Sequence, residues 1–299
     1  MQGVVNLDKP VGPTSHDMVG LLRRLTGTRR IGHAGTLDPL ASGVLPILVG
    51  PATRFSEELT GGRKGYHATV RLGVRSATDD AEGPLEPGAE SLPDPADVER
   101  VLTTFIGTFD QRPPAFSARR ADGRRGYRAA RAGGPLDLPA RQVTIDSIDP
   151  IAMHRGSRWL DVEIDVRCGP GTYIRSLARD LGERLGCGGY LAGLRRTEAA
   201  GLRVENASTP DALQRLAEGG RLEEVIHPIA GLVPLPRIVL APADAARFLH
   251  GRTVQVPGTG DGRHVVLAGE ELLGIGTLAA GVLQPNKVVA SQVPVSASR

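Results

Sequence analysis

The sequence predicts an α+β protein whose strands and amphipathic helices are joined by many turns. Its 299 residues include 39 glycines and 23 prolines, which together make up about 21% of the chain against a typical ~12%. Polar and apolar residues alternate over residues 160–168, which is the period of a half-buried strand. Apolar residues recur at helical spacing over residues 174–181. Both periods and frequent turns therefore favour a mixed α and β fold.

The N-terminal segment is expected to form a strand, a turn and a helix. The sequence GVVNLDKPVGPTS begins with apolar residues and continues with the prolines and glycine that are typical of a turn. Ser15 is a suitable N-cap for the next helix and Gly27 a suitable end. Between them, four apolar residues keep helical spacing: Met18, Leu21, Leu22 and Leu25.

Residues 31–50, IGHAGTLDPLASGVLPILVG, join a polar turn to an apolar run. We expect the aliphatic half to be a buried strand that supports the turn from behind. The polar half holds His33, Thr36 and Asp38 between glycines and a proline. Glycine, aspartate and proline are ordinary turn residues, so Asp38 either shapes the turn or performs chemistry there.

The middle of the chain continues with a strand, a loop and a helix. Alternation over residues 66–73 predicts a strand with Tyr66 on its apolar face. Residues 76–95 are acidic and rich in proline and glycine, which predicts a loop. Asp94 and Pro95 then begin a helix, whose apolar residues recur at helical spacing: Val98, Val101, Leu102, Phe105 and Ile106.

The strand over residues 160–168 gives the clearest pattern in the sequence. A Gly-Pro-Gly turn at residues 169–171 follows it, and a helix is expected from about Thr172. Arg175 then lies one turn into this helix, with Tyr173 two residues before it.

After about residue 232 the sequence changes to proline-punctuated short strands and one short helix that ends near Gly251. We therefore predict two domains, a larger one over residues 1–234 and a small β-rich one over residues 235–299. No internal repeat or coiled-coil seam is apparent, which favours a monomer.

Composition excludes several classes of protein. The only cysteines, Cys168 and Cys187, lack the spacing of a zinc site or a disulfide scaffold. ATP, NAD and serine-hydrolase motifs are absent. The first residues do not resemble a signal peptide, and no apolar run approaches the ~20 residues of a membrane span. We expect a cytoplasmic protein, and the sequence disfavours zinc, ATP and NAD sites.

Charge indicates a nucleic acid as partner. The net charge is +3, and residues 111–131 hold seven arginines against one acid, Asp122, with Phe116 and Tyr127 between them. Basic residues interleaved with aromatic ones suit a loop that grips nucleic acid, although a solvated charged face is the simpler alternative. We expect an insertion at about residues 110–140 that grips nucleic acid, and the family resemblance described below implies that this nucleic acid is RNA.

Four residues are candidates for chemistry, each with a plainer structural role. One of them, His33, could be a turn residue, a general acid or a stacking ring. A carboxylate such as Asp38 can act as a nucleophile or stabilise positive charge at a sugar carbon, and it needs a cation beside it. Arg175 is a candidate for that cation, or an exposed helix residue. Tyr66 is a core aromatic residue or a platform on which a base stacks.

Six ordered motifs resemble those of the bacterial tRNA pseudouridine-55 synthases of the TruB type. The resemblance runs from residue 3 to about residue 235, and the tail resembles the small RNA-binding PUA-type module of such enzymes. The motifs are GVVNLDKPVGPTSHD, GHAGTLDPLASGVLP, KGYHATVRLG, RPPAFSA, GTYIRSLARDLG and LRRTEAAG.

This resemblance implies a mixed, largely antiparallel sheet flanked by helices and loops, and an enzyme that isomerises the T-loop uridine of tRNA without cofactor or metal. It implies that Asp38 is the catalytic aspartate, that Arg175 pairs with it, and that Tyr66 stacks on the flipped base. Residues implied to bind the substrate are His33, Tyr173, Leu194, Lys9 and Arg119; Lys9 belongs to a KP motif expected to be structural. Phe116 and Arg119 depart from the tyrosine and lysine common in relatives.

The reaction breaks the bond between uracil and ribose, rotates the base and rejoins it through carbon. Positive character then builds at the anomeric carbon, which a single ionised carboxylate stabilises. The sequence leaves open whether Asp38 attacks the sugar, attacks the base or assists elimination. Two rival functions are a nucleosidase-like hydrolase and a non-catalytic RNA-binding protein.

Overall fold

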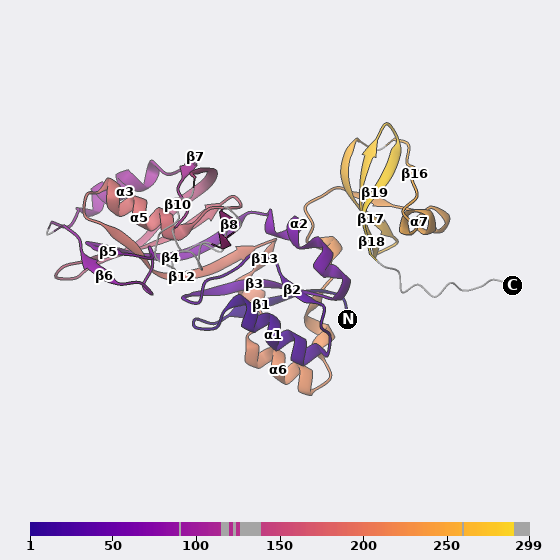
Figure 1. Cartoon of the computed structure of the whole chain (residues 1–299), viewed down its shortest axis with the longest axis horizontal. Coiled ribbons are helices and arrows are strands. Elements are labelled where there is room, and N and C mark those ends of the chain that lie inside the picture. The colour runs from indigo at the N-terminus through magenta and orange to yellow at the C-terminus, as the bar shows by residue number, and fades with distance from the viewer. Residues whose placement is uncertain (90, 115–119, 122–123, 126–138, 259, 290–299) are drawn as a thin grey trace.

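The computed structural model of this chain describes residues 1–89, 91–114, 120–121, 124–125, 139–258 and 260–289. A large mixed sheet carries helices at both ends, and a smaller sheet follows near the C-terminus (Figure 1). The predicted α+β class, with its largely antiparallel sheet and β-rich C-terminal part, is confirmed.

The large sheet has ten strands in the order β14-β1-β3-β12-β4-β11-β10-β7, with β13 beside β12 and β2 beside β3. Strands β3 and β12 run parallel, while the other neighbours are antiparallel. The strands are β1 (Gly3–Lys9), β2 (Ile31–His33), β3 (Ala41–Val49), β4 (Lys64–Leu72), β7 (Gly107–Gln111), β10 (Arg141–Arg155), β11 (Leu160–Cys168), β12 (Gly189–Ala199), β13 (Leu202–Arg203) and β14 (Ile226–His227).

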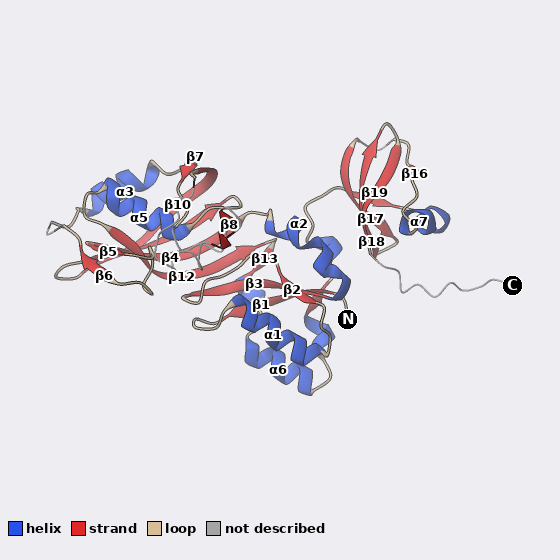
Figure 2. Ribbon diagram, in the orientation of Figure 1, coloured by secondary structure: helices blue, strands red, loops and turns tan. Residues whose placement is uncertain are grey.

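Two helix pairs cover this sheet (Figure 2). Near β1 and β3 lie α1 (Ser15–Thr26) and α6 (Pro210–Glu218), and at the other end lie α3 (Pro95–Thr103) and α5 (Ile174–Arg184). No helix in the described part of the chain is long and apolar enough to span a membrane. The remaining short elements are η1 (Gly50–Phe55), α2 (Ser56–Thr60), η2 (Val204–Asn206), η3 (Leu222–Val225), η4 (Ile229–Gly231) and the hairpins β5 (Val74–Ser76)–β6 (Leu85–Pro87) and β8 (Arg120–Ala121)–β9 (Arg124–Arg125).

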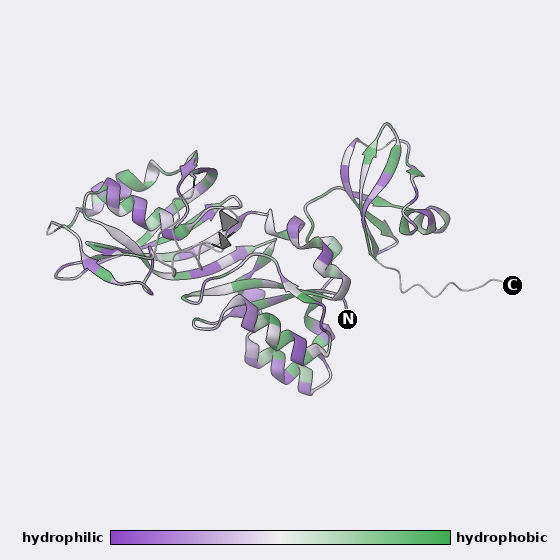
Figure 3. Ribbon diagram, in the orientation of Figure 1, coloured by the Kyte–Doolittle hydropathy of each residue, from purple (hydrophilic) through white to green (hydrophobic). Residues whose placement is uncertain are grey.

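Strand periodicity accounts for the core. Along β11 the side chains at every second position from Leu160 to Cys168 are buried, as the alternation predicts. Figure 3 shows hydrophobic and hydrophilic residues alternating along the strands of the large sheet and along the helices beside it. Every residue of β3 except the half-buried Ser42 is buried, so the aliphatic half of residues 31–50 is the buried strand that the sequence predicts.

Helix ends differ by a few residues from those predicted. The N-cap of α1 is Thr14, whose side chain and that of Asp17 form a capping box. Ser15 is therefore the first helical residue, and its side chain is turned inward and buried. Helix α3 ends at Thr103, so Phe105 and Ile106 lie beyond it although they continue its spacing. Helix α5 begins at Ile174 rather than near Thr172.

The C-terminal part forms a five-stranded sheet in the order β15-β17-β18-β19-β16. Its core residues lie on both the strands and one short helix. This is the separate β-rich unit that the change in composition predicts, whereas the boundary at residues 234 and 235 stays a prediction. Its elements are β15 (Arg237–Val239), α7 (Pro242–Leu249), β16 (Val254–Gln255), β17 (Gly262–Ala268), β18 (Glu271–Ala279) and β19 (Val282–Val288).

A charged contact joins this second sheet to the first. The carboxylate of Glu58, only 4% exposed, lies 2.7 Å from Arg263 and 3.0 Å from Lys287. Burial alone would raise the pKa of Glu58, but hydrogen bonds from Lys287 and Arg263 hold it below its usual value. Glu57 also contacts Lys287, at 2.8 Å. Helix α2 is thus the element on which the C-terminal sheet is anchored.

The parallel contact between β3 and β12 requires glycine at position 43. A Cβ on Gly43 would lie 2.2 Å from the carbonyl oxygen of Arg196, and its φ is +100°. Gly12 has a similar φ of +108° but nothing within 4 Å of such a Cβ. We predict that Gly12→Ala lowers the free energy of unfolding by about 1–3 kcal/mol through backbone strain. Gly43→Ala should lower it by at least about 2 kcal/mol more, because of the overlap.

Urea unfolding followed by circular dichroism measures both variants. Equal losses of unfolding free energy in the two alanine variants would contradict the close approach of β3 and β12.

Candidate active site

The turn that carries Asp38 is held from behind by α1 and β1. The hydroxyl of Ser15 accepts a hydrogen bond from the Leu37 N–H and donates one to the Leu37 carbonyl, both at 2.9 Å. The Ala41 N–H donates to the Asp38 carbonyl at 3.0 Å, which closes the turn. Ser15 thus fixes the backbone of the residue immediately before Asp38.

Lys9 supports the same turn from inside the protein. Its side chain is fully buried, and its ammonium donates to the carbonyls of Pro10, Pro13 and Pro39 at 2.8, 2.7 and 3.4 Å. Burial lowers the pKa of Lys9 to about 8, and the charge of Asp38 offsets part of that shift. Lys9 does not line the cavity described below, so its geometry matches the structural role of the KP motif rather than contact with a substrate.

Arg196 is the third support of the turn. Its guanidinium is 1% exposed and donates to the carbonyls of Val44, Thr36 and Gly35 at 2.7, 3.3 and 3.0 Å. It reaches them from β12, where it lies opposite Tyr66 of β4. One buried cation therefore ties the turn to the central strands of the sheet.

A cavity of about 740 Å³ opens above this turn. It brings together six of the residues that the sequence singles out: His33, Asp38, Tyr66, Tyr173, Arg175 and Leu194. They come from separate elements, and Leu194 of β12 lies opposite both Ala41 and Ala68. Arg119 lies outside the described residues. So does most of the segment predicted to grip nucleic acid, namely residues 115–119, 122–123 and 126–138.

Arg175 is shared between two carboxylates at the floor of the cavity. Its Nη2 lies 3.0 Å from Oδ2 of Asp38 and its Nη1 lies 3.2 Å from Oδ2 of Asp80. The guanidinium is 7% exposed, the Asp80 side chain 4% and the Asp38 side chain 40%. Asp80 is therefore an inner anchor for Arg175, whereas Asp38 presents its carboxylate to the cavity.

Asp80 is a site residue that the sequence does not single out. It lies in the acidic loop before β6, where several other acidic residues surround it and its charge does not distinguish it. Its Oδ1 accepts hydrogen bonds from Thr78 at 2.5 Å and from the Glu82 N–H at 3.1 Å. Because these contacts fix the carboxylate, Asp80 can hold Arg175 in one orientation.

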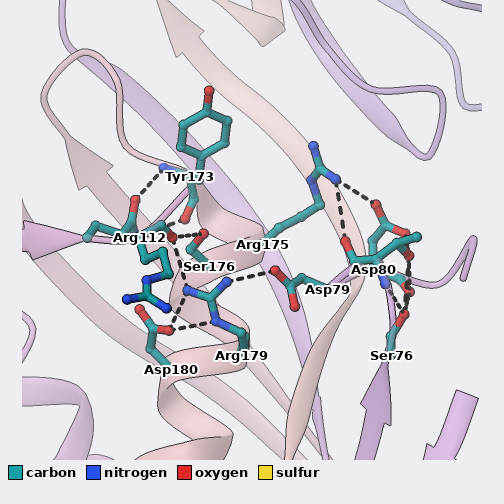
Figure 4. A network of polar contacts seen from close by, with 11 residues as sticks. Ser76, Asp79, Asp80, Arg112, Tyr173, Arg175, Ser176, Arg179 and Asp180 are labelled. Atoms are coloured by element: carbon teal, nitrogen blue, oxygen red, sulfur yellow. Dashed lines mark hydrogen bonds and ion pairs between the residues drawn. The ribbon is translucent and has the colours of Figure 1, made fainter. Parts of the chain in front are cut away.

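The residue before Asp80 is held by a second arginine (Figure 4). Asp79 has φ of +62°, a conformation that is rare outside glycine. Arg179, one turn after Arg175 on α5, contacts its carboxylate at 2.9 Å and also donates to the Arg112 carbonyl at 3.0 Å. The first turns of α5 are thus tied to the loop that carries Asp80.

A buried glutamine fixes the start of α5. The side-chain amide of Gln111 donates to the Tyr173 carbonyl at 3.0 Å and accepts from the Tyr173 N–H at 2.9 Å. Gln111 is 2% exposed and ends β7. This reciprocal pair satisfies the backbone where the chain turns into α5, so that the ring of Tyr173 remains at the cavity.

Tyr66 lies at the buried side of the cavity. Its residue exposure is 7% and its ring packs into the main core cluster. Burial raises the pKa of the Tyr66 phenol above its ordinary value, while Arg196 acts in the opposite direction. A neutral ring beside Asp38 is suited to stacking and poorly suited to removing a proton at neutral pH.

His33 lines the cavity at the end of β2. Its Nδ1 is buried and has no hydrogen-bond partner within the described residues. Burial, followed by the charges of Arg196 and His16, lowers the pKa of His33. The ring is therefore neutral at pH 7, and it is the ring rather than Nδ1 that borders the cavity.

No cluster of three or more His, Cys, Asp or Glu side chains arranged to hold a metal ion occurs among the described residues. Cys168 and Cys187 are both buried free thiols.

Comparison with known proteins identifies the chain's relatives. Residues 23–174 match the model described as "TruB family pseudouridylate synthase (N terminal domain)". Residues 175–245 and 236–289 match two C-terminal models of the same enzymes, described as "tRNA pseudouridylate synthase B C-terminal domain" and "Pseudouridine synthase II TruB, C-terminal".

Similar proteins named tRNA pseudouridine synthase B occur in several bacteria. The one from Ralstonia nicotianae is 40% identical and covers 97% of this chain and 94% of its own length. The one from Acaryochloris marina is 41% identical over 98% and 100% of the two chains. The one from Corynebacterium aurimucosum is 48% identical over 71% and 72%.

Solved structures with the same fold include one titled "Crystal Structure of a Cbf5-Nop10-Gar1 Complex", with a TM-score of 0.73, 28% identity and coverage of 96% of this chain and 84% of that one. Another, titled "Structure of H/ACA RNP bound to a substrate RNA containing 2'-deoxyuridine", has a TM-score of 0.72 and 26% identity over 96% and 84%. With its family models and full-length relatives, the chain belongs to the TruB family of pseudouridylate synthases.

Proposed function

We propose that this chain converts the T-loop uridine at position 55 of tRNA to pseudouridine, and that Asp38 is its catalytic residue. The observation that carries the proposal is the contact of Arg175 with Asp38 at the floor of a cavity that Tyr66 also lines. The family relationship supplies the reaction, and this geometry supplies the groups that the reaction needs. The T-arm as binding partner, a monomeric state and a cytoplasmic location remain part of the proposal.

The reaction rearranges one nucleotide without gain or loss of atoms. The bond between N1 of uracil and C1′ of ribose breaks, the base rotates, and C5 bonds to C1′ while its hydrogen is lost and N1 takes one up. Positive character at C1′ is stabilised by a carboxylate, which is the part assigned to Asp38. Arg175, 3.0 Å from that carboxylate, provides the opposite charge that a carboxylate needs after RNA has displaced water.

The cavity also accounts for the selection of a flipped base. Removing a base from a folded loop costs a few kcal/mol, and stacking on an aromatic ring returns about 1–3 kcal/mol per base. Tyr66 offers such a ring beside Asp38, and Leu194 closes the same wall. His33 and Tyr173 stand at the cavity as the contacts for neighbouring bases.

The first prediction tests the assignment itself. Wild-type protein incubated with an unmodified tRNA transcript should form pseudouridine at position 55 and release no uracil, and Asp38→Asn should form none because it lacks the carboxylate. Asp8→Asn is the matched control, since Asp8 pairs with Arg195 at 2.8 Å and does not line the cavity. The readouts are pseudouridine mapping and chromatography of free bases.

Each rival gives a distinct result in that experiment. Free uracil from wild type would indicate a hydrolase, and tRNA binding without product would indicate a non-catalytic binding protein. Full product from Asp38→Asn would remove Asp38 from the chemistry.

The second prediction concerns Asp80. Asp80→Asn keeps the shape of the side chain but removes half of the charge that holds Arg175. Because a small displacement of a catalytic group is costly, kcat should fall about a hundredfold. The Kd for tRNA should change by less than about threefold, since Asp80 is buried and binds no substrate. Single-turnover kinetics and filter binding separate the two, and a change confined to Kd would contradict the positioning role.

The third prediction follows from the low pKa of His33. His33→Ala should weaken tRNA binding about tenfold through lost stacking, whereas His33→Phe should stay near wild type. The protonated form of His33 gains population only below its ordinary pKa of 6.5, so the alanine penalty should be equal at pH 7 and pH 8. A penalty that is larger at pH 7 than at pH 8 would instead show that His33 binds RNA as a cation.

A further inference from the structure

Lys64 is a cation at the cavity that the proposed chemistry does not use. It begins β4 directly after α2 and lines the cavity together with Asp38 and Arg175. Its ammonium donates to the carbonyl of Thr60 at 2.9 Å and to that of Gly62 at 3.0 Å. An ammonium has three donors, so these two bonds fix its position and leave one donor for a ligand.

A second cation lies close to Lys64. A Cβ built on Gly35 would lie 3.9 Å from Cε of Lys64 and 3.5 Å from Nη1 of Arg196, so both cations border the same glycine of the Asp38 turn. Gly35 has φ of +92° and no side chain, which leaves the space between the cations open. Burial and the charge of Arg196 lower the pKa of Lys64.

Among the described residues, the two cations lack carboxylate partners such as those of Arg175. Within the described part of the chain, Lys64 and Arg196 donate to backbone carbonyls, Arg196 also makes a hydrogen bond with the Tyr66 side chain, and neither cation bonds a carboxylate. A charge removed from water is unfavourable unless an opposite charge compensates it. An anionic group that enters the cavity would supply that compensation.

We propose that Lys64 binds a phosphodiester group of the RNA next to the uridine that is held over Asp38. The inference rests on the proposed function, because it takes the ligand in the cavity to be a flipped nucleotide. Lys64 and Tyr66 are two positions apart on one face of β4, about 7 Å along the strand. A base stacked on Tyr66 therefore places its own backbone within reach of the ammonium.

The test joins a variant of Lys64 with neutralisation of single linkages in the substrate. Three tRNAs are assembled by ligation: one all-phosphodiester, one with a methylphosphonate on the 5′ side of the target uridine and one with it on the 3′ side. Fluorescence anisotropy gives Kd for each RNA with wild type, Lys64→Met and the control Arg63→Met. Arg63 is the neighbouring residue, is 70% exposed and pairs with Asp146 away from the cavity.

On the all-phosphodiester tRNA, Lys64→Met should raise Kd about tenfold, the value of a charged hydrogen bond. It should also reduce the slope of log Kd against log salt by about one. On one of the two methylphosphonate RNAs the penalty of Lys64→Met should disappear. The neutral linkage of that RNA lacks the phosphate charge that the ammonium of Lys64 binds, so removal of the ammonium costs nothing more. Arg63→Met should show no such dependence on a single linkage.

A penalty of Lys64→Met that is equal on all three RNAs would overturn the proposal and leave Lys64 as a structural end to α2. Lys64→Gln replaces the methionine variant if the latter does not fold, because its amide can still donate to a carbonyl of α2. Pseudouridine formation by wild type on the all-phosphodiester tRNA is measured in parallel. Its absence would reject the proposed function, whereas its presence with an equal penalty would reject only the role of Lys64.

Discussion

The site depends on one guanidinium that serves two carboxylates. Arg175 reaches Asp38 and Asp80 at 3.0 and 3.2 Å, and the two partners differ tenfold in exposure, 40% against 4%. The buried carboxylate fixes the arginine, and the arginine in turn orients the exposed carboxylate. Much of the surrounding structure maintains this arrangement: Gln111 fixes the start of α5, and Ser15 fixes the backbone before Asp38. Asp38 and Asp80 thus differ in the exposure of their carboxylates, although both are aspartates that contact Arg175.

Elements with a strict period could be predicted from sequence, and contacts made by loops could not. The alternation over β11 predicts its bounds, because burial on one face requires that pattern. Physical reasoning from the residues alone favours Asp38 as an ordinary turn residue. The prediction that it is catalytic depends on the ordered family motifs. The role of Asp80 could not be predicted, because the direction of its side chain depends on the backbone of Asp79, which has φ of +62°. A glycine at that position would have indicated such a conformation in the sequence, but an aspartate does not. Arg179 holds that conformation from another element, a contact that only the fold creates.

The C-terminal sheet is attached to a wall of the same cavity. Glu57 lines the cavity and contacts Lys287 of β19, and Glu58 beside it is buried against Lys287 and Arg263. The apolar cluster beneath includes Phe55 of η1 together with residues of β17 and β18. Helix α2 both lines the cavity and forms ion pairs with the C-terminal sheet. These contacts orient the C-terminal sheet relative to the cavity, which a flexible linker by itself would not do. An RNA that touches both sheets would meet a preformed surface and would lose less entropy on binding.

The distribution of charge explains how one cavity can hold both a carboxylate and a polyanion. Arg175 pairs inside the protein with both Asp38 and Asp80, so one cation is shared between two carboxylates. Lys64 and Arg196, which both border Gly35, donate to backbone carbonyls and have no carboxylate partner among the described residues. The same cavity is therefore lined by an exposed carboxylate and by cations that have no carboxylate partner among the described residues. Electrostatic groups placed in this way before the substrate arrives need no rearrangement during the reaction, which is why three separate supports hold so short a turn.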